Sequence, residues 1–253
     1  IVRGGWPASI GESEKIALRH AIDYVEAIIN ADVSRVDGIE KNPVRVRALL
    51  RSLSRNISTL ATIRTIHDDI AMGDADESIS EKTISQYLGA LDRIFVTENL
   101  PAWNPALRSK TAIRTSPKRQ FVDPSIAAAV MRLTPSRLLE DFNYFGFLFE
   151  SLCDRDLRIY AEAIDGQVFH YRDGSGLEAD AVIALNDGRW AAVEVKLGSK
   201  EIEDAAVHLL ELKNKVNTEK MREPSFLMIL TGTEIAYRRE DGVYVVPLGC
   251  LKD

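Results

Sequence analysis

Residues 177–197 read LEADAVIALNDGRWAAVEVKL, and this segment gives the strongest indication of the fold of the second half of the chain. Apolar and polar residues alternate over 177–185 and again over 190–197, which is the period of a β-strand. Between the two runs, Asn186-Asp187-Gly188 is typical of a tight turn. The segment therefore predicts a hairpin that places Asp180 and Glu194 on neighbouring strands.

The sequence around this hairpin predicts a mixed α/β sheet. A long amphipathic helix is predicted over 142–163 and a first strand over 167–172. A helix over 201–220, an apolar strand over 226–230 and a last strand over 243–247 follow the hairpin. Because helix, three strands, helix and two strands succeed one another, we expect an α/β domain over residues 123–253. Its first two short helices begin at Asp123-Pro124 and Thr134-Pro135.

The predicted hairpin brings together side chains that can support metal-assisted hydrolysis. Glu194 and Lys196 lie two residues apart, so they share one face of their strand, and Asp180 lies beside them on the next strand. Two carboxylates of this kind hold a hard cation such as Mg²⁺ or Mn²⁺. Such a cation activates a bound water and neutralises phosphate charge, while a nearby lysine stabilises the charged transition state. The pattern predicts metal-dependent phosphodiester hydrolysis.

Several short motifs in this frame resemble a known family. They are Gly146-x-Leu148-x-Glu150, Tyr171-Arg172, Glu178-Ala179-Asp180, Glu194-x-Lys196, the upstream Gly4-Gly5-Trp6-Pro7, and Ser116-Pro117-Lys118 leading into Phe121-x-Asp123. The set resembles the PD-(D/E)xK nuclease superfamily. Within it, the chain is most similar to the C-terminal region of bacterial and archaeal AAA-family ATPases, which carry a winged helix and a nuclease-like domain of unknown function.

The resemblance implies a role for each matching residue. Asp180 and Glu194 would be metal ligands, with Glu178 as a further candidate, and Lys196 would be the catalytic lysine. Glu150 would be the helix carboxylate that completes many sites of the superfamily. One position departs from the pattern, because Ala179 precedes Asp180 where the superfamily has proline. The family also implies an ATPase module upstream as a partner of this region.

The first half of the chain predicts helices. Apolar periodicity favours helices over 12–31, 43–55, 59–71 and 80–94. Asn42-Pro43, Ser58 and the pair Ser78 and Glu81 are the predicted caps. We expect residues 1–57 to be a helical lead-in and residues 58–122 to be a winged helix, which makes the whole chain a mixed α+β protein.

A winged helix predicts a DNA-binding surface. The outward residues of its second helix would be Lys82, Thr83, Gln86 and Arg93, and Arg114 and Lys118 would let the wing contact phosphate. A winged helix that serves only packing or protein docking is an equal alternative. The arginines of the 43–55 helix have two interpretations as well, a phosphate contact or a solvated helix face: Arg45, Arg47, Arg51 and Arg55.

The sequence is therefore consistent with two functions of different classes. The first is Mg²⁺-dependent DNA cleavage, and the alternative is a non-catalytic winged-helix and nuclease-fold adaptor that binds DNA or a partner protein. A surface ion pair is the simplest alternative for Glu194 and Lys196. The second Glu-x-Lys in the chain, Glu211-Leu212-Lys213, lies in a helical pattern without a hairpin aspartate, so we do not assign it a site.

Composition excludes several other classes. The net charge of −6 is uneven, at +2 over residues 1–120 and −8 over the rest, which disfavours a protein that coats duplex DNA. There is no phosphate-loop motif, so we expect neither ATP binding nor ATPase activity from this chain alone. Two isolated cysteines, no transmembrane run and no signal peptide predict a cytoplasmic protein without a membrane partner. Because residue 1 is Ile, we expect a fragment of a longer chain.

Overall fold

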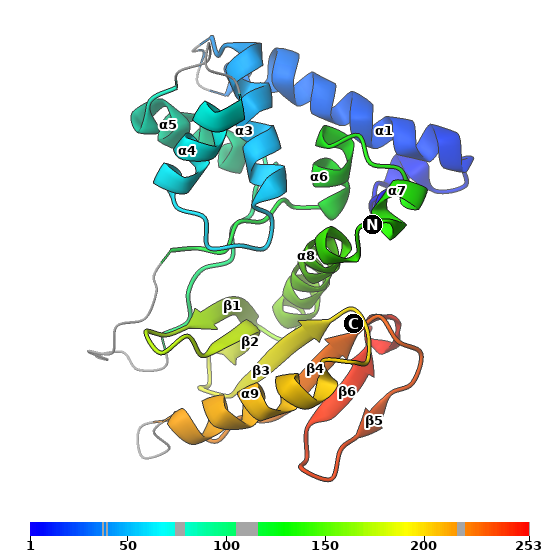
Figure 1. Cartoon of the computed structure of the whole chain (residues 1–253), viewed down its shortest axis with the longest axis vertical. Helices are drawn as coiled ribbons and strands as arrows, with labels where there is room; N and C mark the ends of the chain where they lie inside the picture. The colour runs from blue at the N-terminus through cyan, green and yellow to red at the C-terminus, as the bar shows by residue number, and fades with distance from the viewer. Residues whose placement is uncertain (37, 39, 74–78, 105–115, 217–220, 253) are drawn as a thin grey trace. The chain divides into compact units, whose positions relative to one another are not determined.

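The computed structural model describes residues 1–36, 38, 40–73, 79–104, 116–216 and 221–252. The chain divides into two units (Figure 1), one made of Ile1–Asn99 with Lys118–Ser151 and the other of Leu100–Pro117 with Leu152–Asp253. The first unit is helical and the second contains the sheet, which confirms the predicted mixed α+β class.

The first unit is built from short amphipathic helices. In chain order they are the 3₁₀ turn η1 (Pro7–Ser9), α1 (Glu14–Ala27), the π-helical turn η2 (Ile28–Asp32), α2 (Val33–Arg35), α3 (Pro43–Arg55), α4 (Ile63–Gly73), α5 (Glu81–Arg93), α6 (Pro124–Val130), α7 (Pro135–Leu139) and the first part of α8 (Phe142–Glu162). Their apolar faces form one core, in which Ile28, Leu50, Ile66, Leu91 and Ile126 are fully buried.

Helix caps follow the local sequence at three of the five predicted positions. The side chains of Asn42, Asp123 and Thr134 accept backbone N–H groups of α3, α6 and α7, and each of these helices has proline in its first turn. At α4 the prediction is wrong. The helix begins at Ile63, and Thr62 accepts the Thr65 N–H, because Ser58 donates its hydroxyl to the Phe147 carbonyl instead.

The cap of α5 also differs from the prediction. Ser80 is the N-cap and accepts the Thr83 N–H, whereas Ser78 lies outside the described residues. Beyond α5, an antiparallel bridge in the described residues joins Thr97 to Phe121, and the Glu98 N–H donates to the Gln120 carbonyl next to it. The Val122 N–H donates to the Val96 carbonyl beside it. Helices α4 and α5 and this antiparallel pairing follow one another in the described part, while residues 105–115 of the predicted wing lie outside it.

The two N-terminal glycines form a clasp onto the start of α6. The Gly5 N–H donates to Asp123 Oδ2 over 3.0 Å, and Trp6 Nε1 donates to Ser125 Oγ over 2.9 Å. Gly4 has a φ of +76°, and a Cβ added there would lie 2.5 Å from Trp6 Nε1 and would also overlap Ser125 Oγ. Glycine is therefore required at this position by both backbone conformation and space.

The second unit contains a six-stranded mixed sheet in the order β1-β2-β3-β4-β6-β5. Its elements are the end of α8, β1 (Gly166–Arg172), β2 (Glu178–Leu185), β3 (Trp190–Lys196), α9 (Ile202–Lys215), β4 (Leu227–Thr231), β5 (Tyr237–Arg238), β6 (Tyr244–Pro247) and the 3₁₀ turn η3 (Leu248–Cys250). Strands β1, β2 and β3 are antiparallel neighbours, while β4 is parallel to both β3 and β6. The predicted order of helix, three strands, helix and two strands is confirmed, with the short β5 as an additional strand between those two.

Helix α9 covers one face of this sheet (Figure 1). Its buried Leu209 and Leu212 share a core with Ala192 of β3 and Ile229 of β4. Because side chains alternate along a strand, Glu194 lies on the same face as Ala192, which is the face that α9 covers. The candidate carboxylate is thus held within an apolar layer.

The units divide the chain differently from the three predicted domains. The predicted lead-in over 1–57 and winged helix over 58–122 share a single core, so they form one unit. Residues 123–151, which we expected in the nuclease-like domain, belong to the first unit as well. The reason is that α6 packs against α1 and α3.

Candidate metal and hydrolytic site

The β2–β3 hairpin brings Asp180 and Glu194 together as predicted. Ala181 pairs with Val193, so Asp180 and Glu194 are the next residues along the two strands. The register is fixed by the tight turn, in which Gly188 has a φ of +85° and the Leu185 N–H donates to the Arg189 carbonyl.

Lys196 contacts both carboxylates. Its Nζ lies 2.8 Å from Glu194 Oε2 and 3.7 Å from Asp180 Oδ2. The backbone N–H of Val195 also donates to Asp180 Oδ2, over 2.7 Å, which orients the aspartate. Two carboxylates and one ammonium therefore form a contiguous cluster at the end of β3.

Burial makes Glu194 the unusual member of this cluster. The residue is 2% exposed, and Ile229 of β4 lies opposite it in the register. Burial, followed by the charge of Asp180, raises the pKa of Glu194 to about 8, against the smaller opposing effect of Lys196. Its Oε1 has no hydrogen-bond partner among the residues that the structure describes. Buried carboxylate oxygens are normally satisfied, so this atom is suited to the role of a cation ligand.

Glu178 lies on the same face of β2, two residues before Asp180. Its charge contributes to the raised pKa of Glu194, and its own carboxylate pairs with Arg172 over 3.1 Å. Within the described ranges, no three His, Cys, Asp or Glu side chains converge closely enough to form a metal centre. A cation held here would thus have Asp180 and Glu194 as protein ligands and would keep several waters, as Mg²⁺ commonly does.

Glu150 belongs to the first unit, on α8, where it forms an ion pair with Lys118. Glu150 Oε1 accepts Lys118 Nζ over 2.5 Å, and the two side chains are 15% and 7% exposed. Lys118 was predicted to contact phosphate from the wing, whereas its side chain is buried here. Its ammonium is buried against the Glu150 carboxylate, because an unpaired charge could not be buried there.

The other predicted nucleic-acid contacts lie on α5 or outside the described residues. Lys82, Gln86 and Arg93 are exposed, at the spacing of one helix face. Thr83 is only half-exposed, and its hydroxyl lies 2.9 Å from Ser80 Oγ in the helix cap. Arg114 lies outside the described residues. Three of the six side chains predicted to contact nucleic acid are therefore exposed in the structure.

A second charged cluster, around Asp173 just after β1, has no counterpart in the sequence predictions. Asp173 is buried and accepts the Tyr171 hydroxyl, the Ser175 N–H and hydroxyl, and the Lys215 ammonium. Although burial raises its pKa, these hydrogen bonds, led by that from Lys215, lower it well below the ordinary value. The turn-forming run Asp173-Gly174-Ser175 is the only local signal for it.

The same region contains a pocket of about 300 Å³. It is lined by residues of the β1–β2 loop, β2 and α9: Ser175, Gly176, Leu177, Glu178, His208 and Glu211. Glu211, to which the sequence assigned no site, therefore shares a pocket with the candidate site residue Glu178. Helical spacing alone could not show this proximity, because it depends on where α9 lies on the sheet.

Comparisons with known proteins match the chain in two blocks. Residues 1–137 match the model of a domain of unknown function (DUF8612), and residues 145–251 match that of another domain of unknown function (DUF4143). The second domain is found in AAA-ATPase-associated C-terminal regions. No curated protein matches the chain. No described helix has the length and apolar character needed to span a bilayer.

One solved structure is distantly similar. It is the tetradecameric assembly of Thermococcus gammatolerans McrB AAA+ hexamers with bound McrC. The match covers 81% of this chain and 71% of that chain, at 10% identity and a TM-score of 0.30, which is too low to establish a common fold. The family model over residues 1–137, by contrast, covers more than half of the chain. The chain therefore belongs to the DUF8612 family.

Proposed function

We propose that the chain hydrolyses DNA phosphodiester bonds in the presence of Mg²⁺ or Mn²⁺, with Asp180 and Glu194 as metal ligands and Lys196 as the catalytic lysine. The single observation that carries this proposal is Glu194 Oε1, which is buried without a hydrogen-bond partner among the described residues, beside a second carboxylate. A divalent cation bound between the two carboxylates would supply an activated water and neutralise phosphate charge.

The protein groups each have a physical role in this reaction. Asp180 Oδ2 accepts the Val195 N–H, which orients this carboxylate beside Glu194. Lys196 contacts both acidic side chains in the metal-free chain, and its single charge offsets one negative charge of the pair. Once those carboxylates hold a cation, its ammonium is available for the negative charge that develops on the phosphate. Glu150, in the first unit, is not needed for this proposal, since its carboxylate pairs with Lys118.

DNA is the proposed substrate because the first unit displays Lys82, Gln86 and Arg93 on one face of α5. Phosphate contacts of this type position a nucleic acid without reading its sequence. The match of residues 145–251 to a domain found in AAA-ATPase-associated regions supports a motor module as the partner of this activity.

A non-catalytic adaptor is the second candidate, and one observation favours it. Lys196 and the Val195 N–H already satisfy Asp180 Oδ2 and Glu194 Oε2 within the chain. A cluster that is largely neutralised internally can serve stability alone. Such an adaptor would bind DNA or a protein without cleaving it.

Thermal melts with and without Mn²⁺, combined with nicking of a supercoiled plasmid, separate the two candidates. Metal that binds only the folded state raises the melting temperature by roughly 3 °C at about tenfold excess over its Kd. We expect this rise in the wild type and its absence in Asp180→Asn. Asp187→Asn, in the exposed β2–β3 turn, is the matched control and should keep the rise.

Lys196→Ala distinguishes catalysis from metal binding. Because the ammonium competes with the cation for both carboxylates, the variant should keep a metal-induced rise at least as large as that of the wild type. Its nicking activity should nevertheless fall by about 100-fold or more, since the lysine acts on the transition state. Wild-type protein that shows neither a metal-induced rise nor nicking would exclude the hydrolytic function. A rise without nicking would favour the adaptor.

A further inference from the structure

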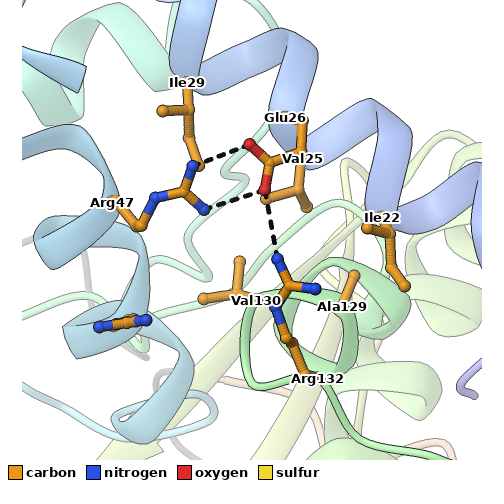
Figure 2. A pocket seen from close by; sticks show the side chains of 9 residues that line it. Ile22, Val25, Glu26, Ile29, Arg47, Ala129, Val130 and Arg132 are labelled. Atoms are coloured by element: carbon orange, nitrogen blue, oxygen red, sulfur yellow. Dashed lines mark hydrogen bonds and ion pairs between the residues drawn. The ribbon is translucent and has the colours of Figure 1, made fainter. Parts of the chain in front are cut away.

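A second candidate site lies in the first unit, far along the chain from the β2–β3 hairpin. It is a pocket of about 40 Å³ formed by α1, η2, α3 and the end of α6, and Figure 2 shows its lining. Its polar groups are three arginines, Arg47, Arg51 and Arg132, and one carboxylate, Glu26. Three guanidinium groups around one carboxylate leave a local excess of positive charge in a protein whose net charge is −6.

Glu26 already occupies the pocket as an oxyanion. Arg47 donates to both of its oxygens, over 3.0 and 2.8 Å, and Arg132 Nη2 lies 3.6 Å from Oε1. In Figure 2 both guanidinium groups point at this carboxylate. The hydrogen bonds from Arg47, followed by the charge of Arg47 and that of Arg132, lower the pKa of Glu26. A fork of this geometry binds phosphate as well as carboxylate.

Arg51 is the arginine of the pocket lining that is not paired with Glu26. It follows Arg47 by one helical turn on α3, so both line the same side. The side chain is exposed, and it forms no ion pair or hydrogen bond with any residue of the described ranges. Glu26 neutralises one of the three guanidinium charges. The N–H groups of Arg51, and those of Arg132, which lies 3.6 Å from Glu26, can therefore donate to an incoming anion.

The backbone at Arg132 is unusual. It has a φ of +52° in the residue that follows the C-cap of α6, where its N–H donates to the Ala129 carbonyl. This left-handed position is normally filled by glycine, and a residue with a side chain costs about 1 kcal/mol there. The fold therefore carries a small strain that places a guanidinium group over Glu26.

The pocket adjoins an apolar groove. The groove has a volume of about 110 Å³ and shares Ile22, Ala129 and Arg132 with the arginine pocket, while Leu18 and Leu133 extend it. The arginine pocket has room for about three waters by the usual measure of water-sized cavities, which is the size of one tetrahedral oxyanion. Together, they have the shape of a site for an anionic head and a small organic substituent.

We propose that this site binds a phosphate monoester, with its phosphoryl group on Arg47, Arg51 and Arg132 and its organic substituent in the adjoining groove. The proposal does not depend on the hydrolytic function, because all of its residues lie in the first unit. Glu26 acts as an internal competitor that holds Arg47 in place when the ligand is absent.

Calorimetric titration of the full chain at low salt tests the proposal with three probes, orthophosphate, phenyl phosphate and a short oligothymidylate. We expect both small phosphates to bind and phenyl phosphate to bind more tightly. Equal binding of the two would overturn the role of the groove. Binding of the oligonucleotide alone would assign these arginines to a nucleic-acid backbone and overturn the proposal, as would the absence of any binding.

Variants then locate the ligand. Arg51→Ala should weaken phenyl phosphate binding by about tenfold, the effect of removing one charge-assisted hydrogen bond. Arg132→Gly should weaken it similarly while the melting temperature stays the same or rises, because glycine relieves the left-handed backbone. Arg45→Ala, on the same helix but outside the pocket, is the control and should leave binding unchanged. Wild-type affinity in both pocket variants would overturn the proposal.

Discussion

At the scale of single residues, the burial of Glu194 opposes its proposed function, because burial favours the protonated acid whereas a metal ligand must be ionised. A carboxyl whose pKa is raised by folding holds its proton more tightly in the folded state. The unfolded chain releases this proton near the ordinary value of 4.5, whereas the folded chain keeps it up to about 8. The contribution of Glu194 to the free energy of unfolding is therefore fully present below about pH 4.5 and is lost as the pH rises from there to about 8.

Glu194→Gln should remove this dependence in the metal-free protein. With a chelator present, the free energy of unfolding of the wild type should fall, relative to the variant, by a few kcal/mol between about pH 5 and about pH 8, since one pKa unit is worth about 1.4 kcal/mol. Denaturant titrations at the two pH values measure the difference. Glu178→Gln, which is much more exposed, is the control and should change little. Parallel pH profiles for the wild type and Glu194→Gln would contradict the prediction.

At the scale of elements, the N-terminal glycines show how a short motif acts through a distant helix. Gly4 and Gly5 precede a tryptophan that bonds Ser125, and Asp123 both caps α6 and accepts the Gly5 N–H. The motif that contributes to the family resemblance is therefore a clasp between the chain start and α6. Its glycine is set by space as much as by backbone conformation.

Gly4→Ala should destabilise the first unit by about 2 kcal/mol or more, because it adds overlap with Trp6 and Ser125 to the strain of a positive φ. Gly11→Ala is a matched control. Gly11 also has a positive φ, of +82°, but an added Cβ there meets nothing within 4 Å. It should cost only about 1 kcal/mol. Chemical denaturation of both variants checks the difference, and equal destabilisation would show that the clasp contributes no packing.

At the scale of the whole molecule, charge is divided along the chain. Residues 1–120 carry a small positive net charge and the remainder a large negative one, but each of the two structural units carries a net charge of −3, so the local charge of an exposed face decides where DNA would bind. The exposed face of α5 offers Lys82 and Arg93 for this purpose. Because these side chains would contact phosphate, they should contribute affinity without sequence preference.

The double variant Lys82→Ala with Arg93→Ala should weaken binding to all DNA sequences alike. It should also flatten the dependence of log K on log salt by about 0.9 for each phosphate that the variant no longer neutralises. Fluorescence anisotropy over a salt series measures both quantities. Lys200→Ala, an exposed lysine of the second unit, should leave the slope unchanged. If the double variant binds with unaltered affinity and slope, α5 is not the DNA surface.

Features that depend on near neighbours along the chain were predictable from the sequence. Period-two alternation and the Asn186-Asp187-Gly188 turn set the hairpin register, and with it the approach of Asp180 to Glu194. The caps at Asn42, Asp123 and Thr134 were equally predictable, since a cap and its N–H partner lie within three residues of each other.

Features that need a partner far away in sequence became evident once the three-dimensional structure was known. The sequence predicts that Lys118 contacts phosphate, but in the structure it is buried in an ion pair with Glu150. The sequence also predicts Ser58 as a helix cap, but its hydroxyl donates to the Phe147 carbonyl. Two further features also depend on residues far apart in sequence. Residues 1–57 and 58–122 share one core, and Glu26 forms ion pairs with Arg47 and Arg132. Local spacing fixes which face of an element a side chain occupies, whereas its burial, charge state and partner depend on which other element packs there.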